Sequence, residues 1–234
     1  ICPVFSDEEA LLGFLVNRAH HAEMGGIAPG SMPPAASNLA EEGVVIPPIP
    51  IMTDGTLVIE EVEALLRHGP YPSRRVEENL ADLKAQVAAN LKGLEDFQSL
   101  IGEHGSKKVV GFMKAIQDRA ENSLRRKLAE IEDGCYQAQQ KLDDGTPLDV
   151  TATVAGDTLT LSFSDGGGVH PGNYNATPGI VYSAVIYFLR VWLNEPMPLN
   201  EGLLRPVHIE LPEGLFNPPF PNDPEHCPPV VAGN

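Results

Sequence analysis

Residues 76–105 have the sequence VEENLADLKAQVAANLKGLEDFQSLIGEHG, and the apolar side chains in this stretch recur at steps of three and four. That spacing places one apolar stripe along an α-helix of about seven turns. His104-Gly105 ends the stripe, and a second run of the same period continues to Asp133-Gly134. Two long amphipathic helices in succession predict an antiparallel helix hairpin whose stripes serve packing or oligomer contact.

A shorter helical pattern precedes the long pair. Residues 53–69, TDGTLVIEEVEALLRHG, offer Thr53 or Asp54 as an N-cap, and Gly69-Pro70 would end the helix. One face of this predicted helix carries Leu57, Val58, Val62, Leu65 and Leu66.

Residues 1–52 have a strand-like pattern. ICPVF and LLGFLVNRAHH would pair through the polar turn Ser6–Glu9, and a third run, GVVIPPIPIM, follows a Gly/Pro loop. Helix propensity offers an alternative for EEALLGFLV. The tight turn and the apolar residues on both faces favour a buried strand.

Beyond residue 133 the apolar residues recur at every second position instead of every third or fourth. Three segments alternate apolar and polar residues and predict a β-meander: CYQAQQKL, LDVTATVA and TLTLSFS. GIVYSAVIYFLRVWLN is apolar nearly all round, which predicts a buried helix, and RPVHIELPEG predicts one more strand before a proline-rich segment at 217–229.

The fold class expected from these patterns is α+β, with an antiparallel β-sheet, a protruding long-helix hairpin and one buried helix. The expected segments are a β part with the His-His and Gly/Pro loop at 1–52, the helical hairpin at 53–133, and the meander with the buried helix and proline-rich end at 134–234.

Charge and composition limit the partners. The 234 residues carry a net charge of −16, so no basic stripe is available for nucleic acid or for an anionic membrane surface. No apolar run approaches the ~18 residues of a membrane span. Cys2, Cys135 and Cys227 form no CxxC pair, which favours reduced thiols in a cytoplasmic protein.

The strongest chemical signal lies in NRAHHAEMGGIAPGSMPP, residues 17–34, where two histidines and a glutamate meet a glycine-rich loop. Imidazole and carboxylate are ligands for Zn, Mn or Fe. On a strand, His20 and His21 would point to opposite faces, so at most one faces a given site. One histidine with Glu23 is not a complete metal site. The alternative is that both histidines hydrogen-bond to loop backbone.

Other candidates are weaker. The loop SDGGGVHPGNYN at 164–175 could present backbone N–H groups to an anion but lacks the lysine of a P-loop, and His170 within it has no evident catalytic partner. Ser31 and Ser37 lie near the histidines, but no nucleophile-elbow motif frames them. Arg74-Arg75 could bind a phosphate or a carboxylate, or simply be a solvated helix start.

Taken together, several stretches carry a family resemblance. NRAHHAEMGGIAPGSMPP, EEGVVIPP, RRVEENLADLKAQVAAN, YSAVIYFL, PLNEGLLRPV and VVAGN occur in an order that resembles the hydantoinase B / 5-oxoprolinase B family from end to end. Family members are longer. They carry a Gly-Gly-Thr-His-Leu-Pro-Asp-type stretch before the position of Ile1 and a large portion after the position of Asn234. The resemblance therefore implies an internal segment of a larger subunit.

The resemblance also implies site residues. In related carboxylases a divalent metal is held by a His and an Asp of that upstream stretch and by a His of the pair that matches His20-His21. It implies His20 as a metal ligand, with Zn, Mn or Fe as the metal, and His21 and Glu23 as catalytic neighbours. The backbone from Gly25 and Gly26 to Ser31 would form a substrate wall.

The activity implied by the resemblance is shared between subunits. A partner of the hydantoinase A type would bind ATP and phosphorylate a small cyclic amide, and this B-type subunit would hydrolyse the activated ring, so a hetero-oligomer is expected. Two alternatives remain open: a carboxylase subunit of the acetone/acetophenone carboxylase type, and a non-catalytic scaffold segment whose helix pair docks the ATP-binding subunit through the Leu83–Leu94 stripe.

Overall fold

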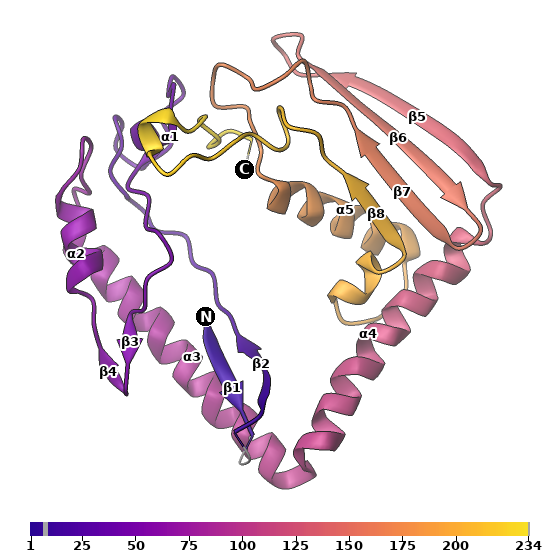
Figure 1. Ribbon diagram of the computed structural model, residues 1–234, viewed down its shortest axis with the longest axis horizontal. Helices are drawn as coiled ribbons and strands as arrows, with labels where there is room; N and C mark the ends of the chain where they lie inside the picture. Colours follow the sequence, from indigo (N-terminus) through magenta and orange to yellow (C-terminus); the bar gives the residue numbers. More distant parts are fainter. Residues whose placement is uncertain (7–8, 234) are drawn as a thin grey trace. The chain divides into compact units, whose positions relative to one another are not determined.

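The computed structural model describes residues 1–6 and 9–233 (Figure 1). The chain divides into two compact units. The amino-terminal unit consists of residues 1–33 and 40–113, and the carboxy-terminal unit of residues 34–39 and 114–234. The sequence-based division at residues 52 and 133 stays a prediction.

The first β-hairpin is confirmed. Strand β1 (Cys2–Phe5) pairs antiparallel with β2 (Leu11–Leu15), so the helical alternative for this segment is wrong. The predicted burial of the second strand is also wrong, since Leu11 is 52 % exposed and Phe14 59 %. The Glu9 N–H donates to the Ser6 carbonyl at 2.9 Å, as a tight turn requires. Asp7 and Glu8 of the predicted turn lie outside the described residues. The strand ends at Leu15, and the chain from Val16 to His21 is irregular.

The predicted third strand at 43–52 is wrong for all but its last residue. Pro47, Pro48 and Pro50 lack the N–H groups that a strand ladder needs, and only a short hairpin follows them, β3 (Met52–Thr53) with β4 (Thr56–Leu57).

The turn of this short hairpin overrides the predicted helix start. Asp54 and Gly55 both have positive φ, 50° and 74°, the requirement of a two-residue hairpin turn, for which Asp-Gly is a preferred pair. The α2 helix therefore begins later and spans Glu60–Arg67. Neither Thr53 nor Asp54 caps it.

The long helix is confirmed as α3 (Val76–His104), and Gly105 ends it. In the amino-terminal unit α2 lies along the first turns of α3 (Figure 1), where Val62, Leu66, Val76 and Leu80 form a buried cluster. The short α1 (Leu39–Glu42) precedes these elements. The second long helix, α4 (Ser106–Leu128), is also confirmed. Because α3 and most of α4 fall in different units, their packing as a hairpin stays a prediction.

The carboxy-terminal unit is built on a four-stranded sheet. The meander of β5 (Gly134–Lys141), β6 (Pro147–Ala155) and β7 (Thr158–Phe163) is antiparallel as predicted. Strand β8 (Val207–Glu210) pairs parallel with β7, so the sheet is mixed and the all-antiparallel prediction is wrong. The reason is the crossover between them: helix α5 (Pro178–Leu193) and the 3₁₀ turn η1 (Glu201–Leu204) return the chain to the starting end of β7.

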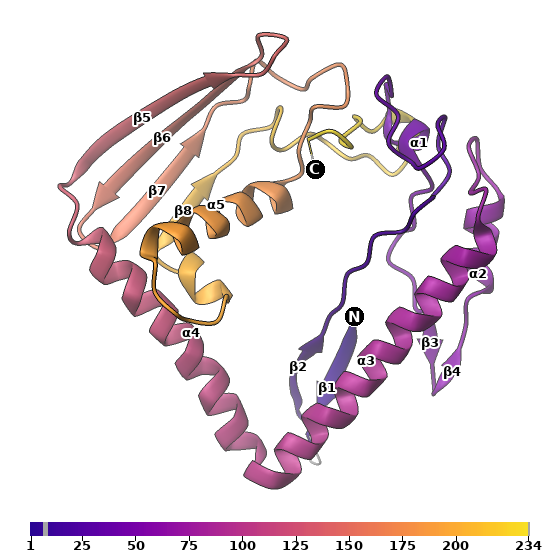
Figure 2. The ribbon, with the colours of Figure 1, turned by 180° about the vertical axis from the view of Figure 1, so that it is seen from behind.

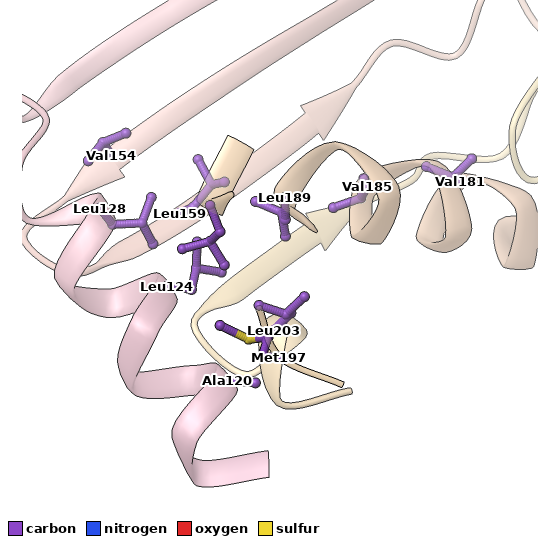
Figure 3. Packing of buried hydrophobic residues seen from close by; sticks show 11 residues of the cluster. Ala120, Leu124, Leu128, Val154, Leu159, Val181, Val185, Leu189, Met197 and Leu203 are labelled. Carbon is purple, nitrogen blue, oxygen red and sulfur yellow. The ribbon is translucent and has the colours of Figure 1, made fainter. Parts of the chain in front are cut away.

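Helix α5 lies against one face of this sheet (Figure 2). Its buried side, Val181, Val185, Leu189 and Leu193, packs with Leu124 and Leu128 of α4 and with Val154 and Leu159 of the sheet (Figure 3). The opposite side is open: Tyr187 is 73 % exposed and Val191 61 %. The predicted buried helix is therefore confirmed on the side that faces the sheet and α4, whereas its opposite side is exposed. The α+β class is confirmed.

The proline-rich segment adds only the 3₁₀ turn η2 (Pro224–His226). None of the three cysteines forms a disulfide. Among the described helices, none has the length and apolar character needed to cross a membrane.

Candidate functional site

The loop after His21 makes two close approaches to backbone within the amino-terminal unit. Gly25 and Gly26 have φ of 92° and 83°, and a Cβ on either would lie 2.2 Å from the Tyr71 carbonyl oxygen or 2.6 Å from that of Glu41. Only glycine fits both the conformation and the space. The predicted contact of these glycines with substrate stays a prediction; the contact seen is with the chain's own backbone.

Ser31 closes the same loop. Its hydroxyl accepts the Met24 N–H at 2.6 Å and donates to the Gly25 carbonyl at 3.0 Å. Both bonds are internal to the loop, so the Ser31 side chain sets the shape of residues 24–31.

Glu23 anchors this loop to the start of α3. Its buried carboxylate accepts four hydrogen bonds: Oε1 from the Gly25 N–H (2.9 Å) and the Arg74 guanidinium (2.7 Å), and Oε2 from the Arg74 N–H (2.7 Å) and the Ser73 hydroxyl (3.1 Å). Burial by itself raises the pKa of the Glu23 carboxyl, but the bonds from Arg74, Gly25 and Ser73 together lower the pKa below its ordinary value. A carboxylate held in this way is a poor base until Arg74 releases it.

His21 belongs to a chain of side-chain hydrogen bonds on α3. Its Nδ1 lies 2.8 Å from Asn79 Oδ1, and its Nε2 lies 3.1 Å from Gln86 Nε2. Since an amide NH₂ only donates, these contacts are satisfied by a neutral ring protonated on Nδ1. The buried Asn79 amide in turn donates to the Glu23 carbonyl at 2.6 Å and to the Ser73 hydroxyl at 2.9 Å.

His20 has the opposite environment. Its side chain is exposed, and its ring makes no hydrogen bond within the described part of the chain. One histidine thus faces the protein and the other faces solvent. The strand on which they were predicted to alternate ends at Leu15, before either histidine. The alternative that both bind loop backbone is wrong for His21, whose partners are side chains.

The predicted metal site at His20 has no further ligands among the described residues. Within residues 1–6 and 9–233, no three His, Cys, Asp or Glu side chains converge on a point that could hold a metal ion. The nearby Glu23 is occupied by Arg74 and Ser73. The residues present therefore do not form a metal site on their own, and any site at His20 needs at least two ligands from elsewhere.

The arginines at the start of α3 are paired. Arg74 binds Glu23, Arg75 binds Glu78, and Arg67 binds Glu63 and Glu77. Their positive charges are therefore matched within the unit, which disfavours a phosphate site. Arg75 fits the solvated helix start, whereas Arg74 binds the buried Glu23 carboxylate.

The glycine-rich loop of the carboxy-terminal unit is also held by internal bonds. The buried Asn175 amide donates to the carbonyls of His170, Gly172 and Pro229. His170 has structural partners: its Nε2 lies 2.7 Å from Asp144, and its Nδ1 accepts the Gly172 N–H. Bonds from the Thr146 backbone and from His170 lower the pKa of Asp144 to about 2. With both ring nitrogens bonded, His170 fixes the loop.

Sequence reasoning missed Asn79, Ser73 and Gln86. One signal was available: Asn79 lies between Val76 and Leu80 on the apolar side of the long helix. A buried amide at such a position needs hydrogen-bond partners, and the adjacent loop with His21 supplies them.

Comparison with known proteins identifies the family of this chain. The model of the family described as hydantoinase B/oxoprolinase matches residues 1–234. The chain belongs to this family. It is 36 % identical over 232 residues to the 5-oxoprolinase of Saccharomyces cerevisiae and 35 % identical over 247 residues to 5-oxoprolinase 1 of Arabidopsis thaliana. These alignments cover 94 % of the chain but only 18 % and 19 % of the two relatives.

The alignment with a bacterial relative covers a larger share of that relative's length. The β subunit of caprolactamase from Pseudomonas jessenii is 29 % identical over 221 residues, which is 92 % of this chain and 37 % of that subunit. The solved structure of the ATP-dependent caprolactamase from the same organism has a TM-score of 0.80 at 25 % identity over 98 % of the chain and 39 % of its own. Acetone carboxylase, at TM-score 0.76 and 16 % identity over 99 % of the chain and 32 % of its own, shares the fold.

Proposed function

We propose that this hydantoinase B/oxoprolinase chain is part of a B-type subunit that hydrolyses a small cyclic amide in an ATP-dependent complex. The family match over the whole chain carries the proposal, and the named relatives act on 5-oxoproline or caprolactam by their descriptions. In the complex, an A-type partner binds ATP and phosphorylates the amide oxygen, which turns a poor electrophile into a reactive one. Water then adds to the ring carbon, and the C–N bond breaks to leave a free amine and an acyl phosphate. A second water hydrolyses the acyl phosphate to a carboxylate and phosphate.

In this proposal His20 acts at the reacting centre. It is the exposed member of the pair, and its loop is fixed by Glu23, Ser31 and His21, so the His20 backbone has a defined position. Preorganisation of this kind lets a side chain act without a reorganisation cost at the moment of reaction. His21 and Glu23 contribute by holding the loop, and a direct catalytic part for either requires that it leave its present partners.

A divalent metal, Zn, Mn or Fe, stays part of the proposal with His20 as one ligand. Because the described residues do not complete the site, no step is assigned to the ion. Elemental analysis of the purified subunit and of its His20→Ala variant tests this part. Near-stoichiometric metal that is lost in the variant supports ligation by His20, and equal metal content in both proteins contradicts it.

The direct test of the reaction is a subunit-mixing assay. The protein is combined with an A-type subunit, ATP and either 5-oxoproline or caprolactam, and the ring-opened amino acid is measured. We expect product only when both subunits, ATP and the cyclic amide are present. ATP turnover without ring opening on both substrates would contradict hydrolysis. A cytoplasmic location, expected from the reduced cysteines, belongs to the same proposal.

A scaffold function is a second candidate because apolar side chains are exposed near the junction of the long helices. Phe112 is 60 % exposed and Met113 44 %. In this account the A-type subunit covers them. The double variant Phe112→Ser and Met113→Ser should then abolish co-purification with the A-type subunit, and unchanged co-purification would exclude this surface. The carboxylase alternative rests on shared fold alone and gains no support from a particular residue.

A further inference from the structure

A hollow of about 640 Å³ in the amino-terminal unit adjoins the His21 network. It lies between the middle of α3, the start of β1 and the segment before β3. Its size suits a small organic ligand. Pro48 and Pro50 stiffen one wall, and Ile51 and Leu91 supply apolar surface. The hollow is therefore largely preformed.

Three carboxamides line this hollow: Asn17, Gln86 and Asn90. The Asn17 NH₂ is used, since it donates to the Gln86 carbonyl at 2.7 Å. The Gln86 NH₂ is used as well, by His21. Their side-chain oxygens make no hydrogen bond within the described residues, and neither does any part of the Asn90 amide. The hollow thus offers several acceptors and one complete amide, each able to bond a ligand.

This set of groups matches a cyclic amide. A lactam presents one N–H and one C=O on an otherwise apolar ring. A carboxamide side chain bonds both groups, because it carries a donor and an acceptor side by side. Polar groups that converge in an apolar hollow fix the orientation of a ligand and reject ligands that cannot pair with them.

The charge of the lining discriminates between cyclic amides. Among the described residues, no Lys, Arg or His side chain lines the hollow, and its one lining carboxyl group is that of Asp54. A ligand carboxylate such as that of 5-oxoproline would be desolvated there with no cationic side chain to compensate it. An uncharged ring such as caprolactam avoids this cost.

Resting on the proposed function, we infer that this hollow is a binding site for uncharged cyclic amides, with Asn90 as the residue that recognises the ring amide. The hollow should bind a neutral lactam more tightly than 5-oxoproline, although this chain is more similar in sequence to the two oxoprolinases than to the caprolactamase subunit.

The test is a calorimetric titration of the purified protein with caprolactam and with 5-oxoproline, without ATP or partner. We expect 5-oxoproline to bind at least about tenfold more weakly than caprolactam, which corresponds to about 1.4 kcal/mol. Equal or tighter binding of 5-oxoproline would overturn the inference, as would no binding of caprolactam at millimolar concentration.

Asn90→Leu isolates the recognition step. It keeps the size of the side chain, improves helix propensity and breaks no bond within the described residues. Caprolactam should bind at least about tenfold more weakly to this variant. The same change at Asn122, exposed on α4, is the matched control and should leave binding unchanged. Unchanged binding in Asn90→Leu would overturn the inference.

The two proposals fail separately. If caprolactam binds through Asn90 but no ring is opened in the mixing assay, the hydrolase function fails and the site stands. If rings are opened with the same KM in Asn90→Leu, the site fails and the function stands.

Discussion

At the scale of single residues, adjacent side chains in this protein have different tasks. His21 is bonded at both ring nitrogens, whereas His20 is exposed beside it. The polypeptide achieves this because Asn79 and Gln86, seven residues or about two turns apart on α3, both face the loop. The exposed histidine is thereby left without a partner among the described residues, while its neighbour is held against α3.

The first prediction contrasts the two histidines. His21→Ala leaves the Asn79 carbonyl and the Gln86 amide without partners, so the free energy of unfolding should fall by about 2 kcal/mol. His20→Ala should change it by less than about 0.5 kcal/mol, because the side chain is exposed. Urea denaturation followed by circular dichroism measures both. Equal losses in the two variants would contradict the assigned geometry.

The second prediction concerns Glu23. Glu23→Gln replaces a carboxylate oxygen by an NH₂ group that faces N–H donors, and we expect a loss of about 2 kcal/mol in unfolding free energy. Glu60→Gln, an exposed glutamate at the start of α2, is the control and should be neutral.

The same carboxylate makes stability depend on pH. The lowered pKa of Glu23 means that the folded state holds its proton more weakly than the unfolded state, whose pKa is near 4.5. The contribution is complete above that value and is lost as the pH falls through the folded pKa. Denaturation curves between pH 6 and pH 3 should therefore converge for wild type and Glu23→Gln. Curves that stay parallel across this range would show that Glu23 carries no such linkage.

At the scale of elements, the spacing of apolar residues and the positions of turn-forming residues predicted most of the helices and strands. The stripe in 76–104 and the alternation in 134–163 predicted α3 and the meander correctly. Buried apolar partners occur along only part of each, at Val76 and Leu80 of α3 and at Val154 and Leu159 of the sheet. The helix predicted at 53–69 was wrong at its start because two positive-φ residues, Asp54 and Gly55, fit a hairpin turn better than a cap. The parallel β8 could not be foreseen, since strand direction is set by the crossover through α5.

Local patterns predicted less of the candidate site. The double histidine and the glycine pair were visible in the sequence, but the partners that decide their roles lie more than forty residues away on α3. Such pairing depends on the tertiary fold and leaves no short-range pattern. Only the amide of Asn79 on an apolar helix face gave a local indication.

The third prediction tests the glycine loop. Gly26→Ala forces a Cβ to 2.6 Å from the Glu41 carbonyl oxygen in a left-handed conformation, and should cost about 3 kcal/mol or more. Gly30→Ala has nearly the same φ, 82°, but meets no atom within 4 Å, so only the conformational cost of about 1 kcal/mol remains. Thermal denaturation of both variants separates the close approach from the backbone preference. Equal melting temperatures would show that the approach is relaxed in solution.

The fourth prediction concerns α5. Leu189→Ala empties a position that is fully buried against α4 and the sheet (Figure 3), and should cost about 3 kcal/mol. Val191→Ala lies on the open side of the same helix and should change stability by less than about 0.5 kcal/mol. A comparable loss in both would mean that the open side is covered in the protein.

At the scale of the whole molecule, the candidate site and the larger apolar core belong to different units. The amino-terminal unit holds His20, the Glu23 network and the hollow beside Asn90, whereas the carboxy-terminal unit holds the larger apolar core. The chain spans less than a fifth of the oxoprolinases and 37 % of the caprolactamase subunit. A site that needs further ligands for His20 fits a protein in which other segments contribute to the same reaction.

The central claim is that His20 acts in ring opening while its neighbours only position it. The most direct measurement is ATP-dependent product formation by the complex with wild-type protein, with His20→Ala and with Asn122→Leu as a matched surface control. We expect His20→Ala to lose at least about a hundredfold in ring opening with unchanged stability, as removal of a group from the reacting centre does. Ring opening by His20→Ala at the wild-type rate would contradict the claim and leave His20 without a part in the reaction.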